Sequence, residues 1–230
     1  EGDIFGDYRR LEVDTKLEDI KFLAPIEPSK IICIGRNYVE HIHELNNEVP
    51  DEPVIFQKPD TALLRENAPF FIPEFTQDVH YEVELVVKIK KMGKFIPVQF
   101  AQTYYDEISL GIAFTARDLQ SKLKAKGLPW EKSKGFDHSA VIGPFLPKAS
   151  FNLNKLNFRL EKNGTIVQQG NTQQMINSID QIISHVSEYF TLKVGDYIYT
   201  GTPSGVGPVA PDDTLVGFIE TEEMFRFKVK

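Results

Sequence analysis

Cysteine is almost absent from the sequence: Cys33 is the only one among 230 residues. A single cysteine cannot form an intramolecular disulfide, so the fold must be stabilised by a buried core, for which the chain is long enough. Cys33 lies within the apolar run KIICIG (30–35), where a buried thiol that packs as a small hydrophobic group is the simplest interpretation. We therefore expect a reducing, cytoplasmic location.

Long apolar runs and an excess of basic residues are also missing. No uninterrupted apolar stretch approaches the length that spans a bilayer, which excludes a membrane protein. Lys and Arg number 26 against 33 Asp and Glu, giving a formal net charge of -7. Basic residues do not cluster among aromatic ones either, so nucleic acid is not expected as a partner. With 41% hydrophobic and 26% charged residues, the composition is that of a globular protein.

Residues 1–27 are acidic and broken by glycine and proline, which predicts a short lead-in rather than a separate domain. The main body occupies residues 28–230 and has no internal repeat. Short β-like runs alternate irregularly with proline and glycine, and only three segments have helical spacing. This pattern predicts a strand-dominated mixed α/β fold rather than alternating βαβ units. The runs are Lys30–Ile34, Val54–Gln57, Tyr81–Ile89, Phe158–Glu161, Tyr197–Thr200 and Arg226–Val229.

The first helix is expected to start at Asn37 as N-cap, with Glu40 in the capping-box position. A second is expected from Thr115 to Gly127, with its charged side chains facing outward. The third begins at Ser178 and carries an apolar stripe that predicts a core-facing helix. In the first helix, Tyr38, Ile42 and Leu45 form the apolar face, and the helix is expected to end at Asn46 and Asn47. In the third helix, Gln181 is the expected capping-box partner of Ser178.

Two glutamates stand in the alternating segment HYEVELVV (80–87). Because strand side chains alternate between faces, Glu82 and Glu84 point the same way, roughly 7 Å apart along the strand. Mg²⁺ commonly takes one or two carboxylates together with water, which suits this pair. The alternative is a half-exposed antiparallel strand whose polar face carries glutamates, and Lys88 and Lys90 on that face favour it.

A histidine and a glutamate lie three residues apart on the first predicted helix. His41 and Glu44 share a face, whereas His43 points the opposite way. A carboxylate that orients a histidine fixes its tautomer and stabilises the imidazolium, the usual arrangement for activating a water near neutral pH. The alternative is a surface pair that contributes a few tenths of a kcal/mol to helix stability.

Arg117 and Gln120 share a face at the start of the second predicted helix, where backbone N–H groups and a guanidinium together can bind a small carboxylate. A polar first turn is the alternative. The glycine-rich segment Thr200–Gly207 follows a predicted strand, but it lacks the Lys-Ser/Thr ending of a P-loop, so nucleotide binding is not supported. A tight hairpin or bulge is its simpler interpretation. The chain also has no nucleophile elbow.

Taken together, the order and spacing of these segments resemble the fumarylacetoacetate hydrolase family, most closely its short acylpyruvate hydrolase and oxaloacetate decarboxylase branch. The resemblance covers residues 28–230. It implies a mixed β-sandwich roll, a homodimer, and a location in the mitochondrial matrix if the source is eukaryotic. The segments that carry it are IGRNY (34–38) with His41 and Glu44, EVPDEPVIFQKP (48–59), HYEVE (80–84), TARDLQ (115–120), GLPW (127–130) and GTPSGVG (201–207).

The resemblance also implies roles for individual residues. Glu82 and Glu84 match two ligands of the family's Mg²⁺ or Mn²⁺, and His41 with Glu44 match its water-activating dyad. Lys134 falls at a catalytic position. The positions that hold the substrate's carboxylate and carbonyl oxygens are Arg36, Arg117, Gln120 and Thr202.

One position departs from the family pattern. The third metal ligand of the family is an aspartate four residues before the arginine of the TARD segment, and here that residue is Ala113. A methyl group cannot coordinate a cation, so metal affinity should fall.

The resemblance thus implies a metal-dependent enzyme that cleaves acylpyruvate-type 2,4-dioxo acids to release pyruvate, with oxaloacetate decarboxylation as a related activity. The substrate would be a small 2-oxo acid. Two alternatives remain: an isomerase or tautomerase of unsaturated 2-oxo diacids, and an inactive substrate-binding protein, which the loss of a ligand at Ala113 would explain.

Overall fold

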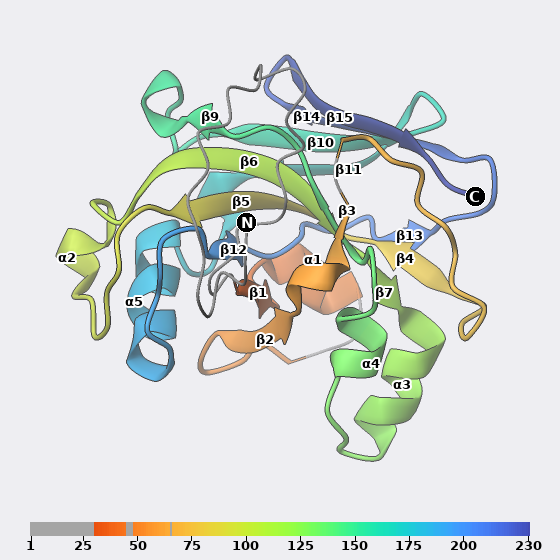
Figure 1. Ribbon diagram of the computed structural model, residues 1–230, viewed down its shortest axis with the longest axis horizontal. Helices are drawn as coiled ribbons and strands as arrows, with labels where there is room; N and C mark the ends of the chain where they lie inside the picture. The colour runs from red at the N-terminus through yellow and green to blue at the C-terminus, as the bar shows by residue number, and fades with distance from the viewer. Residues whose placement is uncertain (1–29, 45–47, 65) are drawn as a thin grey trace, which may run out of the picture.

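The computed structural model describes residues 30–44, 48–64 and 66–230. The predicted lead-in (1–27), together with Leu45, Asn46 and Asn47 of the first predicted helix, lies outside these residues. Strands predominate over helices, as the sequence predicts, and they form three sheets (Figure 1). Within the described residues, no helix is long and apolar enough to cross a membrane.

The largest sheet has the strand order β2-β1-β12-β5-β6-β8-β3, with β9 paired to β6. Its pairs are mostly antiparallel, but β1 runs parallel to β12 and β3 parallel to β8. Its strands are β1 (Ile31–Gly35), β2 (Val54–Lys58), β3 (Leu63–Leu64), β5 (Val83–Ile89), β6 (Tyr105–Ala113), β8 (Ala140–Ile142), β9 (Leu146–Pro147) and β12 (Tyr197–Tyr199).

Two smaller antiparallel sheets complete the strand framework. The four-stranded sheet packs against the large one, and the three-stranded sheet lies where the chain enters β5 and leaves β6 (Figure 1). The four-stranded sheet consists of β11 (Thr165–Asn171), β10 (Asn157–Lys162), β14 (Thr214–Ile219) and β15 (Glu222–Lys228). The three-stranded sheet consists of β13 (Gly207–Pro208), β4 (Val79–Tyr81) and β7 (Thr115–Ala116).

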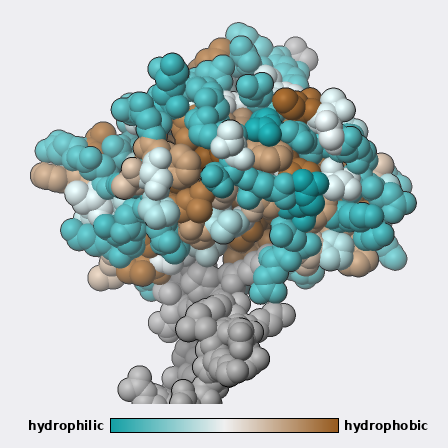
Figure 2. Space-filling model, turned by 90° about the horizontal axis from the view of Figure 1, so that it is seen from above, coloured by the Kyte–Doolittle hydropathy of each residue, from teal (hydrophilic) through white to brown (hydrophobic). Residues whose placement is uncertain are grey.

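The α-helices of the described residues are short and lie around the sheets. Helices α2 and α5 pack together at one end, whereas α3 and α4 lie at the other (Figure 1). On the face shown in Figure 2, hydrophilic residues predominate and hydrophobic patches lie between them. The helices are α1 (Val39–Glu44), α2 (Val98–Ala101), α3 (Arg117–Ala125), α4 (Glu131–Lys134) and α5 (Ile179–Tyr189).

Both faces of the large sheet are buried, which explains the continuous apolar run at 30–35. Ile32 and Ile34 of β1 point into the main core, shared with the four-stranded sheet and α5. Ile31 and Cys33 point to the opposite face, into a smaller cluster with Val86. Strands covered on both sides lose the hydrophobic–polar alternation of half-exposed ones. The predicted buried thiol of Cys33 is therefore confirmed.

Helix α5 follows its sequence signals closely. Ser178 is the N-cap and Gln181 completes a capping box, as predicted. The apolar stripe of this helix is buried, which is worth about 1.5–3 kcal/mol for each large side chain. Its buried apolar members are Ile179, Ile182, Ile183 and Val186.

The predicted starts of the other two helices are wrong. Helix α1 begins at Val39, and the Asn37 side chain donates instead to the carbonyl oxygens of Asn177 (3.0 Å) and Thr200 (2.8 Å). Thr115 belongs to β7, and α3 begins only at Arg117. The predicted end at Gly127 fits better, because this glycine has a φ of 62° and its N–H bonds back to the helix.

Candidate active site

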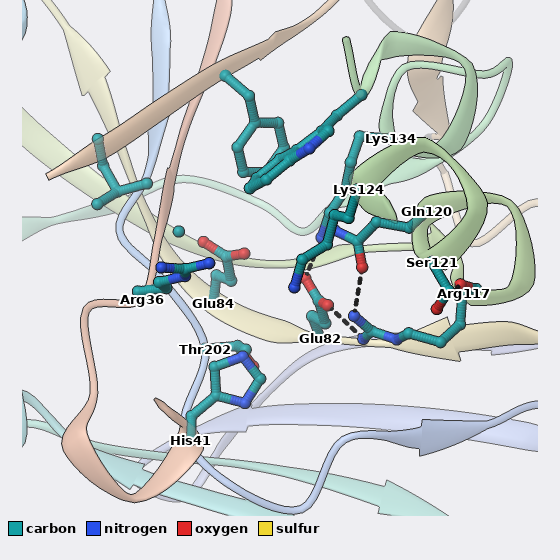
Figure 3. A pocket seen from close by; sticks show the side chains of 14 residues that line it. Arg36, His41, Glu82, Glu84, Arg117, Gln120, Ser121, Lys124, Lys134 and Thr202 are labelled. Atoms are coloured by element: carbon teal, nitrogen blue, oxygen red, sulfur yellow. Dashed lines mark hydrogen bonds and ion pairs between the residues drawn. The ribbon is translucent and has the colours of Figure 1, made fainter. Parts of the chain in front are cut away.

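A cavity of about 170 Å³ opens where β1, β5, α1, α3, α4 and the β12–β13 loop meet (Figure 3). It brings together eight of the residues that the sequence singled out, which are up to 166 residues apart in the sequence, from Arg36 to Thr202. Those eight are Arg36, His41, Glu82, Glu84, Arg117, Gln120, Lys134 and Thr202; Ile34, Gly35, Phe56, Ser121, Lys124 and Trp130 complete the lining.

Glu82 binds two cationic side chains at the base of the cavity. Its Oε1 accepts a hydrogen bond from Arg117 Nη2 and its Oε2 accepts one from Lys134 Nζ, both at 2.6 Å (Figure 3). Burial alone would raise the pKa of Glu82, but the charges of Lys134 and Arg117 outweigh it and hold the pKa well below its usual range. Glu82 is therefore ionised near neutral pH.

Glu84, on β5, lies in a different environment from Glu82, which precedes this strand. Its Oε2 accepts the N–H of Gly201 at 2.6 Å, but burial and the nearby charge of Glu82 raise its pKa to about 8. The strand around these two glutamates is buried almost throughout, so the alternative of a half-exposed strand with a polar face is wrong.

His41 and Glu44 form the pair expected from their spacing. His41 Nδ1 lies 3.3 Å from Glu44 Oε2, and the imidazole is only 7% exposed. Burial lowers the pKa of His41 although Glu82 and Glu44 oppose the shift, so the ring is neutral near pH 7. With Nδ1–H donated to Glu44, Nε2 is the basic nitrogen, and the ring faces the cavity (Figure 3).

Glu44 also anchors helix α1 to the glycine-rich loop. Its Oε1 accepts the N–H of Gly205 at 3.0 Å, and the Ser204 hydroxyl bonds Glu40 one turn earlier in the helix at 3.3 Å. The loop is not the tight hairpin expected as the simpler interpretation, because it runs from β12 to β13, which belong to different sheets. The orientation of His41 thus depends on this loop.

Arg117 and Gln120 are neighbours as expected, since Arg117 Nη1 donates to Gln120 Oε1 at 2.8 Å. The helix N-terminus itself does not provide the predicted anion site. The Arg117 N–H donates to the Asp78 carbonyl oxygen at 2.7 Å, and the Leu119 N–H contacts the Asp118 carboxylate at 2.7 Å. Side chains, rather than helix N–H groups, supply the positive charge.

Lys134 and Thr202 are both fixed by buried partners. Lys134 donates a second hydrogen bond to the Thr115 hydroxyl at 2.6 Å. The Thr202 hydroxyl accepts from Gln168 Nε2 at 2.9 Å, while Gln168 Oε1 accepts the N–H of Val83 at 2.9 Å. Gln168 belongs to β11, so the four-stranded sheet supports both the loop and the glutamate-bearing strand.

Sequence reasoning missed Lys58, a fully buried lysine beneath the cavity. Its ammonium donates to the carbonyl oxygens of Phe114 and Ser139, each at 3.1 Å, and to that of Lys134. Burial lowers its pKa to about 8, so it remains mostly charged at pH 7. The sequence signal that could have identified Lys58 is its position at the end of the apolar strand VIFQK (54–58), directly before a proline.

Ala113 shares a sheet face with the two glutamates. The register pairs Glu84 with Gly111, and the Ala113 N–H donates to the Glu82 carbonyl oxygen at 2.8 Å. Because opposite residues in an antiparallel pair project to the same face, the Ala113 methyl group points to the side of Glu82 and Glu84. A third ligand would belong at this position, and the residue has no oxygen to offer.

The donor set therefore does not match a three-carboxylate Mg²⁺ or Mn²⁺ site. Both oxygens of Glu82 accept from cations, and one oxygen of Glu84 accepts a backbone N–H. In the part of the chain that the structure describes, no three His, Cys, Asp or Glu side chains are grouped so as to hold a metal ion. The residues do form a positively charged cavity with one oriented, neutral base.

The chain is similar to known proteins in both sequence and fold. Residues 30–227 match the family described as fumarylacetoacetate (FAA) hydrolase C-terminal. A mitochondrial oxaloacetate tautomerase of Mus musculus is 43% identical over 201 residues, which are 87% of this chain and 91% of the relative. A mitochondrial oxaloacetate decarboxylase of Dictyostelium discoideum is 44% identical over 188 residues, 81% of this chain and 86% of the relative.

Among solved structures, the fumarylpyruvate hydrolase of Pseudomonas aeruginosa, in complex with Mn²⁺ and pyruvate, superimposes with a TM-score of 0.83. It is 32% identical, and the match covers 90% of this chain and 93% of the hydrolase. The predicted strand-dominated mixed α/β fold and the resemblance drawn from the sequence motifs are confirmed.

Proposed function

The chain belongs to the fumarylacetoacetate hydrolase family, and from that premise we propose that it catalyses keto–enol tautomerisation of a small 2-oxo acid of the oxaloacetate type. The observation that carries the proposal is a neutral base facing a positively charged wall. His41, oriented by Glu44, lines the same cavity as Arg117 and Lys134. The names of the relatives support the choice of substrate.

The reaction needs a proton carrier and a site that stabilises an enolate. His41 Nε2 removes a proton from the carbon between the two carbonyl groups, and the electron pair of that bond moves toward the keto oxygen. Lys134 and Arg117 stabilise the charge that develops on this oxygen. The imidazolium then gives the proton to the oxygen, which completes the shift from keto to enol; the reverse sequence returns the keto form.

Burial and fixed contacts favour this chemistry. Lys134 is only 4% exposed, and its hydrogen bonds to Glu82 and Thr115 hold the ammonium in place before substrate binds. Charges that do not reorganise during the reaction stabilise a transition state more effectively than mobile ones. These residues carry out the proton transfer without a divalent ion, for which the donor set is one carboxylate short of the site that the family pattern implies.

The test follows the ultraviolet absorbance of enol oxaloacetate as it ketonises, with His41→Ala compared with His43→Ala. His43 lies on the same helix but is exposed and does not line the cavity, so it is a matched control. We expect His41→Ala to lose about 100-fold or more of the catalysed rate, the usual contribution of a general base, and His43→Ala to retain it. Full activity of a folded His41→Ala variant would contradict the assigned role.

A second candidate is hydrolysis of acylpyruvate-type 2,4-dioxo acids with release of pyruvate. It is favoured by the His41–Glu44 pair, which can also activate a water, and by the similarity to a fumarylpyruvate hydrolase. Product analysis separates the two reactions, because hydrolysis yields two fragments and tautomerisation yields one. Binding of oxalate without turnover of either substrate would instead indicate an inactive substrate-binding protein.

A further inference from the structure

Gln168 is a buried glutamine that reaches from strand β11 of the four-stranded sheet to the glycine-rich loop beside the cavity. Its side chain amide makes three hydrogen bonds, each 2.9 Å long. Nε2 donates to the Thr202 hydroxyl and to the Pro203 carbonyl oxygen. Oε1 accepts the N–H of Val83. One amide that is only 2% exposed therefore links the loop to the first residue of β5.

Two backbone groups determine the orientation of this amide. A backbone N–H can only donate and a carbonyl oxygen can only accept. The amide atom that faces the Val83 N–H must therefore be the oxygen, and the atom that faces the Pro203 carbonyl must be the nitrogen. The second hydrogen of that nitrogen is directed at Thr202. In the bond between the two side chains, Gln168 is thus the donor and the threonine oxygen is the acceptor.

Strand β11 lies directly against the loop. A Cβ atom at Gly205 would clash with the Val167 carbonyl oxygen and would also contact Gln168 Cγ. Gly205 has a φ of 94°, a left-handed conformation that residues with a side chain rarely adopt. Glycine meets both requirements, and the loop can approach the strand closely enough for the Gln168 amide to reach Thr202.

This arrangement leaves the Thr202 hydroxyl to donate into the cavity. A hydroxyl group has one hydrogen, and that hydrogen cannot point at Gln168, which is itself the donor in their bond. Within residues 30–44, 48–64 and 66–230, the hydroxyl donates to no other group. Thr202 lines the cavity together with His41 and Arg117 (Figure 3). An acceptor oxygen of a ligand in the cavity would therefore complete its hydrogen bonding.

We propose that Gln168 is a positioning residue that makes Thr202 a hydrogen-bond donor to a carboxylate oxygen of the 2-oxo acid. The inference rests on the proposed function and deepens it, because it identifies how the loop recognises the substrate. Gln168 does not line the cavity and acts only through the threonine. A carboxylate keeps its charge throughout the proton transfer, so this contact contributes to substrate binding rather than to the chemical step.

Gln168→Glu tests the inference, because it replaces the Nε2 donor by an oxygen and preserves the size of the side chain. The Thr202 hydroxyl would then donate to the introduced group instead of to the substrate. We expect KM for oxaloacetate to rise about tenfold, the loss of one hydrogen bond to a charged group, with kcat changed by less than about twofold. Gln169→Glu is the matched control with unchanged KM, because Gln169 is exposed on the same strand and lies outside the cavity.

The same substitution in a Thr202→Val background separates positioning of the hydroxyl from other effects. Without the hydroxyl, Gln168→Glu should raise KM by less than about twofold beyond Thr202→Val alone, because the group through which it acts is absent. Losses that multiply in the double variant would overturn the inference, since loop distortion and charge repulsion act in both backgrounds. If Gln168→Glu does not fold, the neutral Gln168→Met replaces it, and a rise in KM of about threefold is expected only where the hydroxyl is present.

Failure of the inference is distinguishable from failure of the proposed function. Unchanged KM in an active Gln168→Glu variant would overturn the inference and leave the proposed function intact. If the unsubstituted chain does not ketonise oxaloacetate, the proposed function fails, and calorimetric titration with oxalate decides the inference alone. About tenfold weaker oxalate binding in Gln168→Glu, with no such loss in the Thr202→Val background, would support it. Equal oxalate binding by the variant, or none by the unsubstituted chain, would overturn it.

Discussion

Ala113→Asp tests how a third carboxylate at this site would affect stability with and without a divalent ion. The Ala113 methyl group lies on the sheet face that carries Glu82 and Glu84, next to Glu82 along the strand pair. The position is fully buried and belongs to the cluster that includes Cys33 and Tyr199. An introduced carboxylate would therefore enter a space that contains two other carboxyl groups and little water.

Without a divalent ion the substitution should be strongly destabilising. An uncompensated buried charge costs about 3–5 kcal/mol. For a chain of this length, each kcal/mol lowers the melting temperature by about 2–4 °C, so we expect a decrease of about 6–20 °C. A bound ion at 100 times its Kd returns about 2.7 kcal/mol, equivalent to an increase of about 5–11 °C.

Thermal unfolding measured by circular dichroism, with EDTA or with added MnCl₂, distinguishes these states. The unsubstituted chain should respond weakly to Mn²⁺, and Ala113→Asp strongly. Ala113→Asn is the control for size, because its carboxamide adds similar volume without the charge. The reasoning would be refuted if Ala113→Asp melted as high as the unsubstituted chain in EDTA, or if Mn²⁺ raised both melting temperatures equally.

Four further predictions concern stability and pH. Lys58→Met should destabilise the fold by about 3–5 kcal/mol, because the buried carbonyl oxygens that Lys58 binds lose their donor. Urea unfolding measures the effect, and a change in the free energy of unfolding below about 1 kcal/mol would contradict the prediction. Burial lowers the pKa of His41 below its usual 6.5, so kcat/KM for oxaloacetate should begin to fall only below that pH, and an acid limb centred above 6.5 would argue against His41 as the base. The same shift means that the unfolded chain binds this proton more readily, so the His41 contribution to stability decreases as the pH falls through 6.5. Ile183→Ala, in the buried stripe of α5, should lower the unfolding free energy by about 2–5 kcal/mol without changing KM for oxaloacetate, and a changed KM would show that the core and the site are coupled.

Local signals predicted the elements whose contacts are local. The capping box of α5 joins residues three apart, Ser178 and Gln181, and the sequence located it correctly. Asn37 carried a similar signal, but its side chain binds groups 140 and 163 residues away. No local pattern reports such partners, and three-dimensional contacts override the intrinsic preference of asparagine for helix starts.

The same distinction applies to the site. Strand alternation placed Glu82 and Glu84 on one face, but it could not show that one is ionised and the other tends to hold its proton. That difference arises from Lys134 and Arg117, which lie 52 and 35 residues from Glu82 in the sequence. The sequence also predicted that the charges of the second helix face outward, but Arg117 and Lys124, which are seven residues apart and share a helix face, both line the cavity.

The missing carboxylate bears differently on the two candidate reactions. Tautomerisation requires one base and a wall that stabilises an enolate, and His41 with the Glu82-bound cations Arg117 and Lys134 supplies both. Hydrolysis also forms an enolate, but in addition it requires a water positioned against a carbonyl carbon. That carbonyl group must be polarised strongly enough for the water to attack. Loss of one carboxylate at Ala113 weakens the site for a divalent ion, the group that would supply such polarisation, while it leaves the base and the cationic wall intact. The geometry of this chain therefore favours proton transfer over bond cleavage.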